Sequence, residues 1–151
     1  MTEAELLEVR DRLEIHELMY RYAEMVDQRD WKQMDRIFAL EATIDYRSTG
    51  GHTGPFREAL AWLDRALESW PINLHVISNI LIEFDGDLAT SRCYFHAPMA
   101  RETPDEPQYI ITNAGRYEDR LVRTRNGWRI LELVCHQTLM QGELPEGYRI
   151  P

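Results

Sequence analysis

The sequence lacks both the cysteines of a disulfide-stabilised domain and the apolar runs of a membrane protein. Its 151 residues include two cysteines, Cys93 and Cys135, which do not form a CxxC pair. We therefore expect a reduced protein with both cysteines in its core. No apolar run approaches the ~20 residues of a membrane-spanning helix. The first residues also lack the basic start and apolar stretch of a signal peptide, so a cytoplasmic location is expected.

Basic side chains are scarce as well. The chain has 17 lysines and arginines against 26 aspartates and glutamates, a formal net charge of −9. A surface of that sign repels phosphate groups, so we expect neither nucleic acid nor an anionic membrane as a partner. The motifs GxGxxG, GxxxxGKS/T, GxSxG and HExxH are absent, which removes the usual sequence support for dinucleotide, nucleotide, serine-hydrolase and zinc-protease chemistry. We expect a protein that acts without a cofactor.

What the sequence does contain is typical of one globular domain. With 44% hydrophobic and 28% charged residues, residues 1–151 have enough apolar side chains to bury a core. In the first half, apolar residues recur at intervals of three and four, which predicts helices over residues 5–26, 31–40 and 56–69. A short β-prone run, 43–46, separates the second helix from the third.

The second half changes to the period of two that characterises strands. Asp85-Gly86 and Asn126-Gly127 lie between alternating runs and predict two hairpins with type I′ turns. A loop with two prolines, 102–107, separates the hairpins, and residues 142–151 are too rich in glycine and proline to form a regular element. This order indicates an α+β fold in which a curved antiparallel sheet wraps around helices and leaves a pocket.

The register of the first hairpin predicts which side chains face that pocket. With Asp85-Gly86 as the turn, His75 lies opposite His96. The face that we expect to line the cavity comprises His75, Ile77, Asn79, Arg92, Tyr94 and His96. A one-residue bulge is the alternative, and it would turn His96 to the other side.

The reverse face of the same hairpin is apolar. It comprises Leu74, Val76, Ile80, Ile82, Cys93 and Phe95. If the helices cover the polar-lined side, this face is left open to water, and such a patch usually marks a protein interface. The prediction is a homodimer formed through the sheet.

Asp27 and His75 are the candidate catalytic pair. Asp27 ends the first helix, where the negative end of the helix macrodipole opposes a carboxylate and a cationic partner would stabilise it. A carboxylate bonded to one imidazole nitrogen fixes the tautomer and leaves the other nitrogen to take a proton. The alternative is structural, with an Asx-turn at Asp27 and a satisfied strand histidine at His75. No HxxxH or HxH spacing favours a metal site, and none is expected.

Other polar side chains have a structural and a functional interpretation. Tyr22 lies on the apolar stripe of the first helix, either in the core or in a pocket wall. Arg116 alternates with Glu118 and Arg120, which is typical of a solvated face with ion pairs, and binding of a substrate is the alternative. The histidines expected to be structural are His16, His52 and His136.

Three segments carry a resemblance to a known family. They are YAEMVDQRDWKQMDRIF at the end of the first helix, NLHVISNILIEFDGDLATSRCYF, and GRYEDRLVRTRNGWRI. Over about residues 5–140 the chain resembles the SnoaL-like group of the nuclear transport factor two-like superfamily. The resemblance implies a cone-shaped, curved antiparallel or mixed sheet wrapped around three N-terminal helices, with an internal pocket.

The resemblance also implies roles for particular residues. Scytalone dehydratase, bile-acid dehydratase and hexachlorocyclohexane dehydrochlorinase pair an aspartate from the end of the first helix with a histidine from the next long strand. Asp27 and His75 occupy the matching positions. Tyr22 resembles the tyrosine of the bile-acid enzyme, but the second acidic residue of that enzyme would fall near Pro98 and has no obvious substitute here.

The resulting prediction is a cofactor-independent lyase. It would remove water or a comparable leaving group from a hydrophobic cyclic molecule, with His75 as base and Asp27 orienting it. His96, Tyr46 and Asn113 resemble the second histidine, the tyrosine and the asparagine of scytalone dehydratase. The residues expected to position the substrate or assist the leaving oxygen are His96, Tyr22, Tyr46, Tyr94, Asn113 and Arg116. A non-catalytic binding module or subunit, and isomerase or polyketide-cyclase chemistry in the same pocket, are the alternatives.

Overall fold

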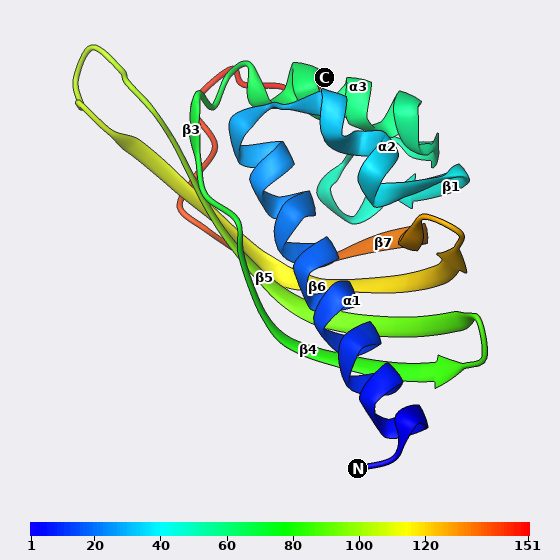
Figure 1. Cartoon of the computed structure of the whole chain (residues 1–151). Coiled ribbons are helices and arrows are strands. Elements are labelled where there is room, and N and C mark those ends of the chain that lie inside the picture. The colour runs from blue at the N-terminus through cyan, green and yellow to red at the C-terminus, as the bar shows by residue number, and fades with distance from the viewer.

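Three α-helices lie on one face of a curved, unclosed sheet of seven strands (Figure 1). The computed structural model describes residues 1–151. The strands are β1 (Phe38–Asp45), β2 (Thr53–Pro55), β3 (Ile72–Asn73), β4 (Val76–Asp85), β5 (Leu88–Arg101), β6 (Tyr109–Thr124) and β7 (Gly127–Gln141). Their order is β2-β1-β7-β6-β5-β3, and β4 also pairs with β5. Because β1 runs parallel to β7 and the other pairs are antiparallel, the sheet is mixed. The predicted α+β fold class is confirmed.

Helix α1 (Glu3–Gln28) is the longest helix and crosses the sheet. It begins at a capping box, in which the Glu5 N–H donates to the Thr2 hydroxyl and the Thr2 N–H donates to the Glu5 carboxylate. Residues 1–10 are exposed, whereas the second half of the helix buries one face against the sheet. The helix predicted over residues 5–26 is confirmed and is slightly longer.

The second helix is shorter than predicted. A single 3-10 turn (Trp31–Gln33) precedes α2 (Met34–Ile37), and the chain becomes extended at Phe38. The helical pattern continues to residue 40, but residues 38–45 form β1 and pair with β7. Tertiary pairing outweighs local propensity there. Helix α3 (Phe56–Leu67) follows Pro55 as predicted.

Both hairpin turns lie one residue away from their predicted positions. Gly86 and Asp87 form the first turn, and only Gly86 has a positive φ, 61°, as in a type II′ turn. Arg125 and Asn126 form the second turn, and Gly127 follows them with a φ of 104°, the pattern of a type I turn with a glycine bulge. Neither turn has the two positive φ angles that type I′ requires.

A β-bulge in β4 changes the pairing of the first hairpin. The register between β4 and β5 shifts between Ser78 and Leu81, and Asn79 within the bulge has a φ of 56°. Together with the displaced turn, the bulge pairs His96 with Val76. The structure therefore contains the one-residue bulge that was the alternative to a regular hairpin.

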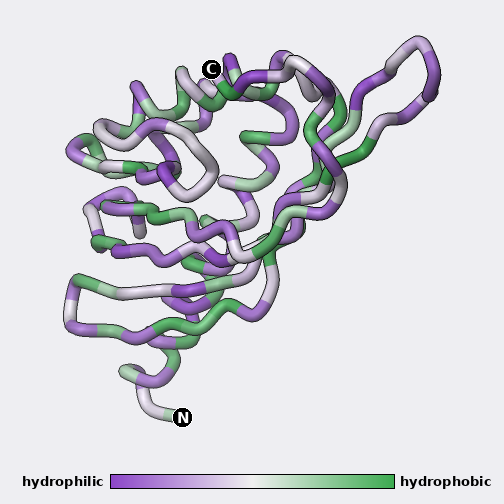
Figure 2. The backbone as a smooth tube through the Cα atoms, turned by 180° about the vertical axis from the view of Figure 1, so that it is seen from behind, coloured by the Kyte–Doolittle hydropathy of each residue, from purple (hydrophilic) through white to green (hydrophobic).

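The predicted polar face of this hairpin is wrong. Cys93 and Phe95 of β5 are buried, whereas Tyr94 and His96 are exposed on the outer face. Hydrophobic and hydrophilic residues alternate along the long strands (Figure 2), and α1 buries its apolar stripe against the apolar face only. Ile82, Cys93 and Phe95 are therefore closed to solvent, whereas Leu74 and Val76 are 59% and 54% exposed, so only part of the apolar surface expected to mediate a dimer is open.

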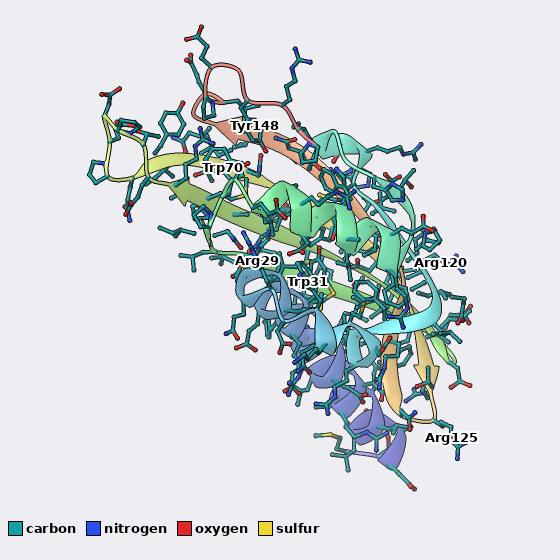
Figure 3. The ribbon with its side chains drawn as sticks, turned by 90° about the horizontal axis from the view of Figure 1, so that it is seen from above. Arg29, Trp31, Trp70, Arg120, Arg125 and Tyr148 are labelled. Atoms are coloured by element: carbon teal, nitrogen blue, oxygen red, sulfur yellow. The ribbon has the colours of Figure 1, made fainter.

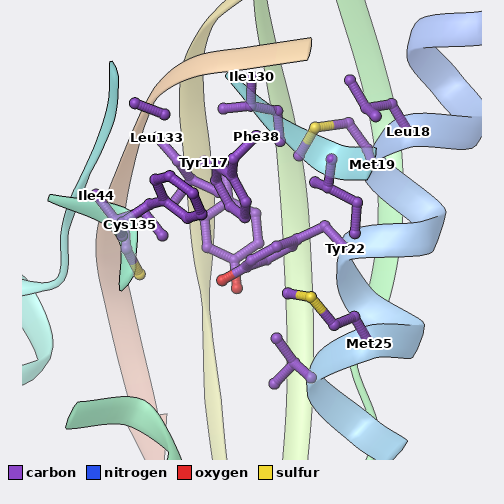
Figure 4. Close-up of a cluster of buried hydrophobic side chains, with 14 of the residues drawn as sticks. Leu18, Met19, Tyr22, Met25, Phe38, Ile44, Tyr117, Ile130, Leu133 and Cys135 are labelled. Atoms are coloured by element: carbon purple, nitrogen blue, oxygen red, sulfur yellow. The ribbon is translucent and has the colours of Figure 1, made fainter. Parts of the chain in front are cut away.

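An aromatic cluster fixes α1 across the middle of the sheet. Tyr22 makes edge-to-face contacts with Phe38 and Tyr117, with ring centroids 6.0 and 5.5 Å apart. Tyr117 in turn stacks on Phe95 at 4.6 Å. Figure 4 shows the side chains of α1, β1 and β6 converging on this cluster. Such aromatic pairs stabilise a core beyond the area that they bury.

An ion pair joins the first half of α1 to the end of β6. Asp11 is 3% exposed, and its two carboxylate oxygens accept hydrogen bonds from Arg123 at 2.8 and 2.7 Å. These hydrogen bonds hold the pKa of Asp11 below its usual range. The Arg123 guanidinium also lies 4.7 Å from the centre of the Trp128 ring.

We predict that Asp11→Ala lowers the free energy of unfolding by about 2 kcal/mol, because it removes two charge-assisted hydrogen bonds from a buried position. Urea denaturation followed by circular dichroism measures the loss. Glu8→Ala is the control, since the Glu8–Arg12 pair is solvent-exposed and should contribute less than ~1 kcal/mol. Equal losses in the two variants would contradict the prediction.

Candidate active site

A cavity of about 150 Å³ lies between α1, α3, the inner face of the sheet and the C-terminal residues. Aromatic side chains provide much of its wall, among them Trp62, Trp70, Phe95 and Tyr117. Its principal polar side chains are Tyr22, Tyr46, His75, Asn113 and Gln137. An apolar space with a few convergent polar groups is the usual form of a small-molecule site.

Asp27 and His75 form a hydrogen-bonded pair at the wall of this cavity. The His75 Nδ1 lies 2.6 Å from Asp27 Oδ1, and the His75 backbone N–H donates to Asp27 Oδ2 at 2.8 Å. Both oxygens of the Asp27 carboxylate therefore make hydrogen bonds to His75. Because the carboxylate accepts at Nδ1, the imidazole keeps its Nε2 lone pair available. The side chains of His75 and Asp27 are only 11% and 19% exposed.

The chain turns sharply just after Asp27. Arg29 ends α1 in the left-handed conformation, with a φ of 53°. Its guanidinium donates to the carbonyl of Leu67 and lies 3.5 Å from the carbonyl of Trp70 (Figure 3). These contacts tie the end of α1 to the end of α3, next to the segment that carries His75. Nothing in the sequence pattern indicated this role for Arg29.

Tyr22 and Tyr46 meet inside the cavity. Their hydroxyl oxygens are 2.6 Å apart, and both side chains are buried and line the cavity wall. Burial raises the pKa of both phenols well above the usual range, so each keeps its proton at neutral pH. The pair can therefore donate a hydrogen bond to a ligand oxygen without forming a charge.

Asn113 and Gln137 form a second polar pair in the wall. Gln137 Nε2 donates to Asn113 Oδ1 at 2.9 Å. The register of β6 and β7 shifts next to this point, because Ala114 pairs with Leu139 and Gly115 pairs with Gln137. Asn113 was selected from the family resemblance. Gln137 was missed, because its inward orientation depends on a bulge that the sequence pattern does not reveal.

C-terminal residues also border the cavity. Leu144, Tyr148 and Ile150 contribute to its wall. Trp70 Nε1 donates to the Tyr148 hydroxyl at 3.3 Å (Figure 3). Trp62 Nε1 donates to the carbonyl of Pro151 at 2.9 Å. The segment 142–151 is irregular, as predicted, but its contribution to the cavity was not anticipated.

The comparisons with known proteins decide the family. A model described as SnoaL-like domain matches residues 7–134. The chain belongs to the SnoaL-like family. Uncharacterized proteins of Mycobacterium tuberculosis (strain ATCC 25618 / H37Rv) and Mycobacterium bovis (strain ATCC BAA-935 / AF2122/97) are each 37% identical to this SnoaL-like chain over 136 residues, which is 88% of this chain and 91% of theirs.

Solved structures share the SnoaL-like fold over nearly the whole chain. A Kribbella flavida protein is 27% identical, with a TM-score of 0.80 over 89% of this chain and 95% of its own. A putative scytalone dehydratase from Novosphingobium aromaticivorans is 22% identical, with a TM-score of 0.75 over 99% of both chains. A hexachlorocyclohexane dehydrochlorinase is 18% identical, with a TM-score of 0.78 over 95% of this chain and 99% of its own. The resemblance noted in the sequence is confirmed.

Three of the selected residues lie outside the cavity of the SnoaL-like domain. His96, Tyr94 and Arg116 are exposed on the outer face of the sheet, and Arg116 donates to Glu118 at 2.9 Å. They alternate with inward-facing residues, so the strand period itself directs them away from the helices. The expectation that they share a pocket with His75 is corrected accordingly.

Two further observations concern membranes and metals. No helix is long and apolar enough to cross a membrane. No group of three or more histidine, cysteine, aspartate or glutamate side chains is placed to hold a metal ion. Both cysteines are free and buried, as predicted.

Asp119 is a buried acid that the sequence analysis did not single out. It lies on the inner face of β6 and is 3% exposed. Ser91 donates to its Oδ2 at 3.1 Å, while its Oδ1 has no partner. Burial raises the pKa of Asp119 to about 8.

We predict that Asp119 makes the free energy of unfolding decrease as the pH rises from about 4 toward 8. In that window the unfolded chain has released the Asp119 proton and the folded chain retains it, so the unfolded state binds fewer protons and rising pH favours it. Asp119→Asn should reduce the difference in unfolding free energy between pH 5 and pH 8 by at least ~1 kcal/mol. Urea denaturation at the two pH values measures this, with Glu118→Gln as the exposed control. An unchanged pH slope in Asp119→Asn would show that Asp119 is ionised in the folded protein.

Proposed function

We propose that this protein is a cofactor-independent lyase that removes water, or a comparable leaving group, from a hydrophobic cyclic molecule. One observation carries the proposal: a histidine held by an aspartate at the wall of an apolar cavity. His75 Nδ1 lies 2.6 Å from Asp27 Oδ1, and His75 lines the cavity. This is the arrangement that general-base catalysis needs.

The proposed reaction begins at His75. Nε2 takes a proton from a ring carbon next to an electron-withdrawing group, and the electron pair of that C–H bond forms the new double bond. The bond to the leaving oxygen breaks, and the imidazolium returns its proton to that oxygen, which departs as water. Asp27 stabilises the imidazolium between these two proton transfers. All atoms balance without a co-reactant.

The hydroxyl pair of Tyr22 and Tyr46 supports the same step. Both hydroxyls are neutral and belong to buried side chains, and a hydrogen bond to developing negative charge is stronger in a buried site than in solvent. We assign them to the leaving oxygen or to the electron-withdrawing group. This assignment replaces the role expected for His96, which lies on the outer face.

The comparisons support the reaction class. Structures named as a putative scytalone dehydratase and a hexachlorocyclohexane dehydrochlorinase share the fold over almost the full chain.

Isomerase or cyclase chemistry would use the same base and differ in where the proton returns. Retention of a ligand without turnover is the second candidate, and the predominantly apolar wall of the cavity favours it. Product analysis separates these possibilities.

We also propose that two copies associate through the outer face of the sheet. Val76, Leu81 and Tyr94 are 54%, 57% and 56% exposed there. Apolar side chains gathered on one exposed sheet face are typical of a protein interface. Val76 belongs to the surface expected from the sequence, whereas Leu81 and Tyr94 do not, so the proposed partner surface overlaps the expected one in part.

We predict that His75→Ala lowers turnover by at least ~100-fold, because general-base catalysis contributes on the order of 10² to 10⁴ in rate. The assay is loss of water from a panel of bicyclic β-hydroxy ketones, followed by mass spectrometry. His96→Ala is the matched control and should retain the wild-type rate, since its side chain is outside the cavity. Near-normal turnover by His75→Ala would refute the proposed base.

A second prediction concerns the tautomer. Nitrogen-15 NMR of the imidazole should show His75 protonated at Nδ1 in the neutral form, because Asp27 accepts there. Asp27→Asn removes the charged acceptor and should shift the population toward the Nε2–H tautomer, with a parallel loss of turnover. If the tautomer is unchanged by the substitution, Asp27 does not orient the ring.

A further inference from the structure

The residues that surround the centre of the cavity lie in one row across the sheet. His75 directly precedes Val76, which pairs with His96 of β5, and the Leu74 N–H donates to the carbonyl of Pro98 at 3.1 Å. These contacts place His75 beside Ala97. Neighbouring strands are about 4.8 Å apart, so the strand on the far side of β5 lies about 10 Å from the His75 backbone.

The strand beyond β5 is β6, and it carries the side-chain amide of Asn113. Ala97 pairs with Asn113, and both residues line the cavity. The Ala97 side chain is a single methyl group, so the space between the His75 imidazole and the Asn113 amide is not filled by the intervening strand.

The amide pair has unused hydrogen-bonding capacity. Each side-chain amide has two N–H donors and one carbonyl acceptor. The bond from Gln137 Nε2 to Asn113 Oδ1 leaves the Asn113 N–H groups and Gln137 Oε1 without a protein partner. Neither atom is sealed off in the protein interior. The pair therefore presents a donor and an acceptor in a cavity wall that is mostly apolar.

We propose that Gln137 is a specificity-determining residue, and that the Asn113–Gln137 pair selects ring compounds that carry a hydroxyl group over halogenated rings of the same size. A hydroxyl oxygen accepts from Asn113 while its proton is donated to Gln137 Oε1. A halogen substituent does not form this pair of hydrogen bonds. Its binding would bury the Asn113 N–H groups and Gln137 Oε1 without a partner. Sites built to hydrogen-bond a hydroxyl reject analogues that lack it, because their own polar groups are left unpaired.

This inference rests on the proposed function, since it names the class of molecule that the lyase would take. Two of the structural neighbours are named as a putative dehydratase and a dehydrochlorinase. The inference distinguishes between these two reactions for this chain. The amide pair favours an oxygen leaving group or an oxygen substituent on the ring.

The test compares binding of 2-naphthol and 2-chloronaphthalene by NMR titration of the nitrogen-15-labelled protein. Gln137→Met keeps the length of the side chain and removes its amide. We expect it to weaken 2-naphthol binding about 10-fold, as for the loss of one hydrogen bond to a polar group, and to change 2-chloronaphthalene binding less than about 3-fold. Met140→Leu, an apolar change in the same wall, should affect the two compounds equally.

A second variant tests the position of the ring. Ala97→Leu fills the gap between His75 and Asn113 and should weaken both compounds by more than about 10-fold. The proposal is overturned if Gln137→Met weakens both compounds to the same extent, if wild type binds neither, or if Ala97→Leu leaves both affinities unchanged. A merely structural role for Gln137 would produce the first of these results.

Failure of the selectivity proposal can be distinguished from failure of the lyase proposal. Binding in the His75→Ala protein is measured without turnover, and the difference between the two compounds should persist there. If that difference is present but no oxygenated ring is ever converted, the lyase proposal fails and the selectivity stands. If turnover is found and Gln137→Met does not alter the preference, the selectivity fails and the lyase stands.

Discussion

The curved sheet has one strongly apolar face, and the helices bury their apolar stripes against that face alone. This constraint follows from the two-residue period of the strands, because each inward residue has an outward neighbour. It buries Cys93 and Phe95 of β5 and exposes Tyr94 and His96. Every polar side chain that does point inward is therefore exceptional, and His75, Asn113 and Gln137 all line the cavity.

The position of Asp27 illustrates how such an exception is stabilised. A carboxylate in the last turn of α1 faces the negative end of the helix dipole. Two hydrogen bonds from His75 offset this unfavourable interaction, and Arg29 turns the chain immediately afterwards. The same contacts that stabilise the helix end therefore hold the imidazole in one orientation. Under the proposed function, these contacts would serve both the stability of the helix end and catalysis.

The local elements were largely predictable from the pattern of side chains. Helices α1 and α3 and the long strands follow the periods of their apolar residues, and α2 ended early only because β1 pairs with β7. The hairpin turns were displaced by one residue, since Gly86 and Gly127 adopt positive φ in other turn types than expected. These displacements move the pairing by two residues and keep the two faces, whereas the one-residue bulge at Asn79 exchanges them.

The sequence by itself determined the fold class, the family and the candidate pair Asp27 and His75, because periodicity and segments that resemble a family are local properties of the chain. Only the tertiary structure decided which polar residues share the cavity. The bulge at Asn79 and the register shift beside Gln137 are non-local outcomes of sheet pairing. They moved His96 outside and brought Gln137 to Asn113, because the register of a strand depends on what both of its faces must contact.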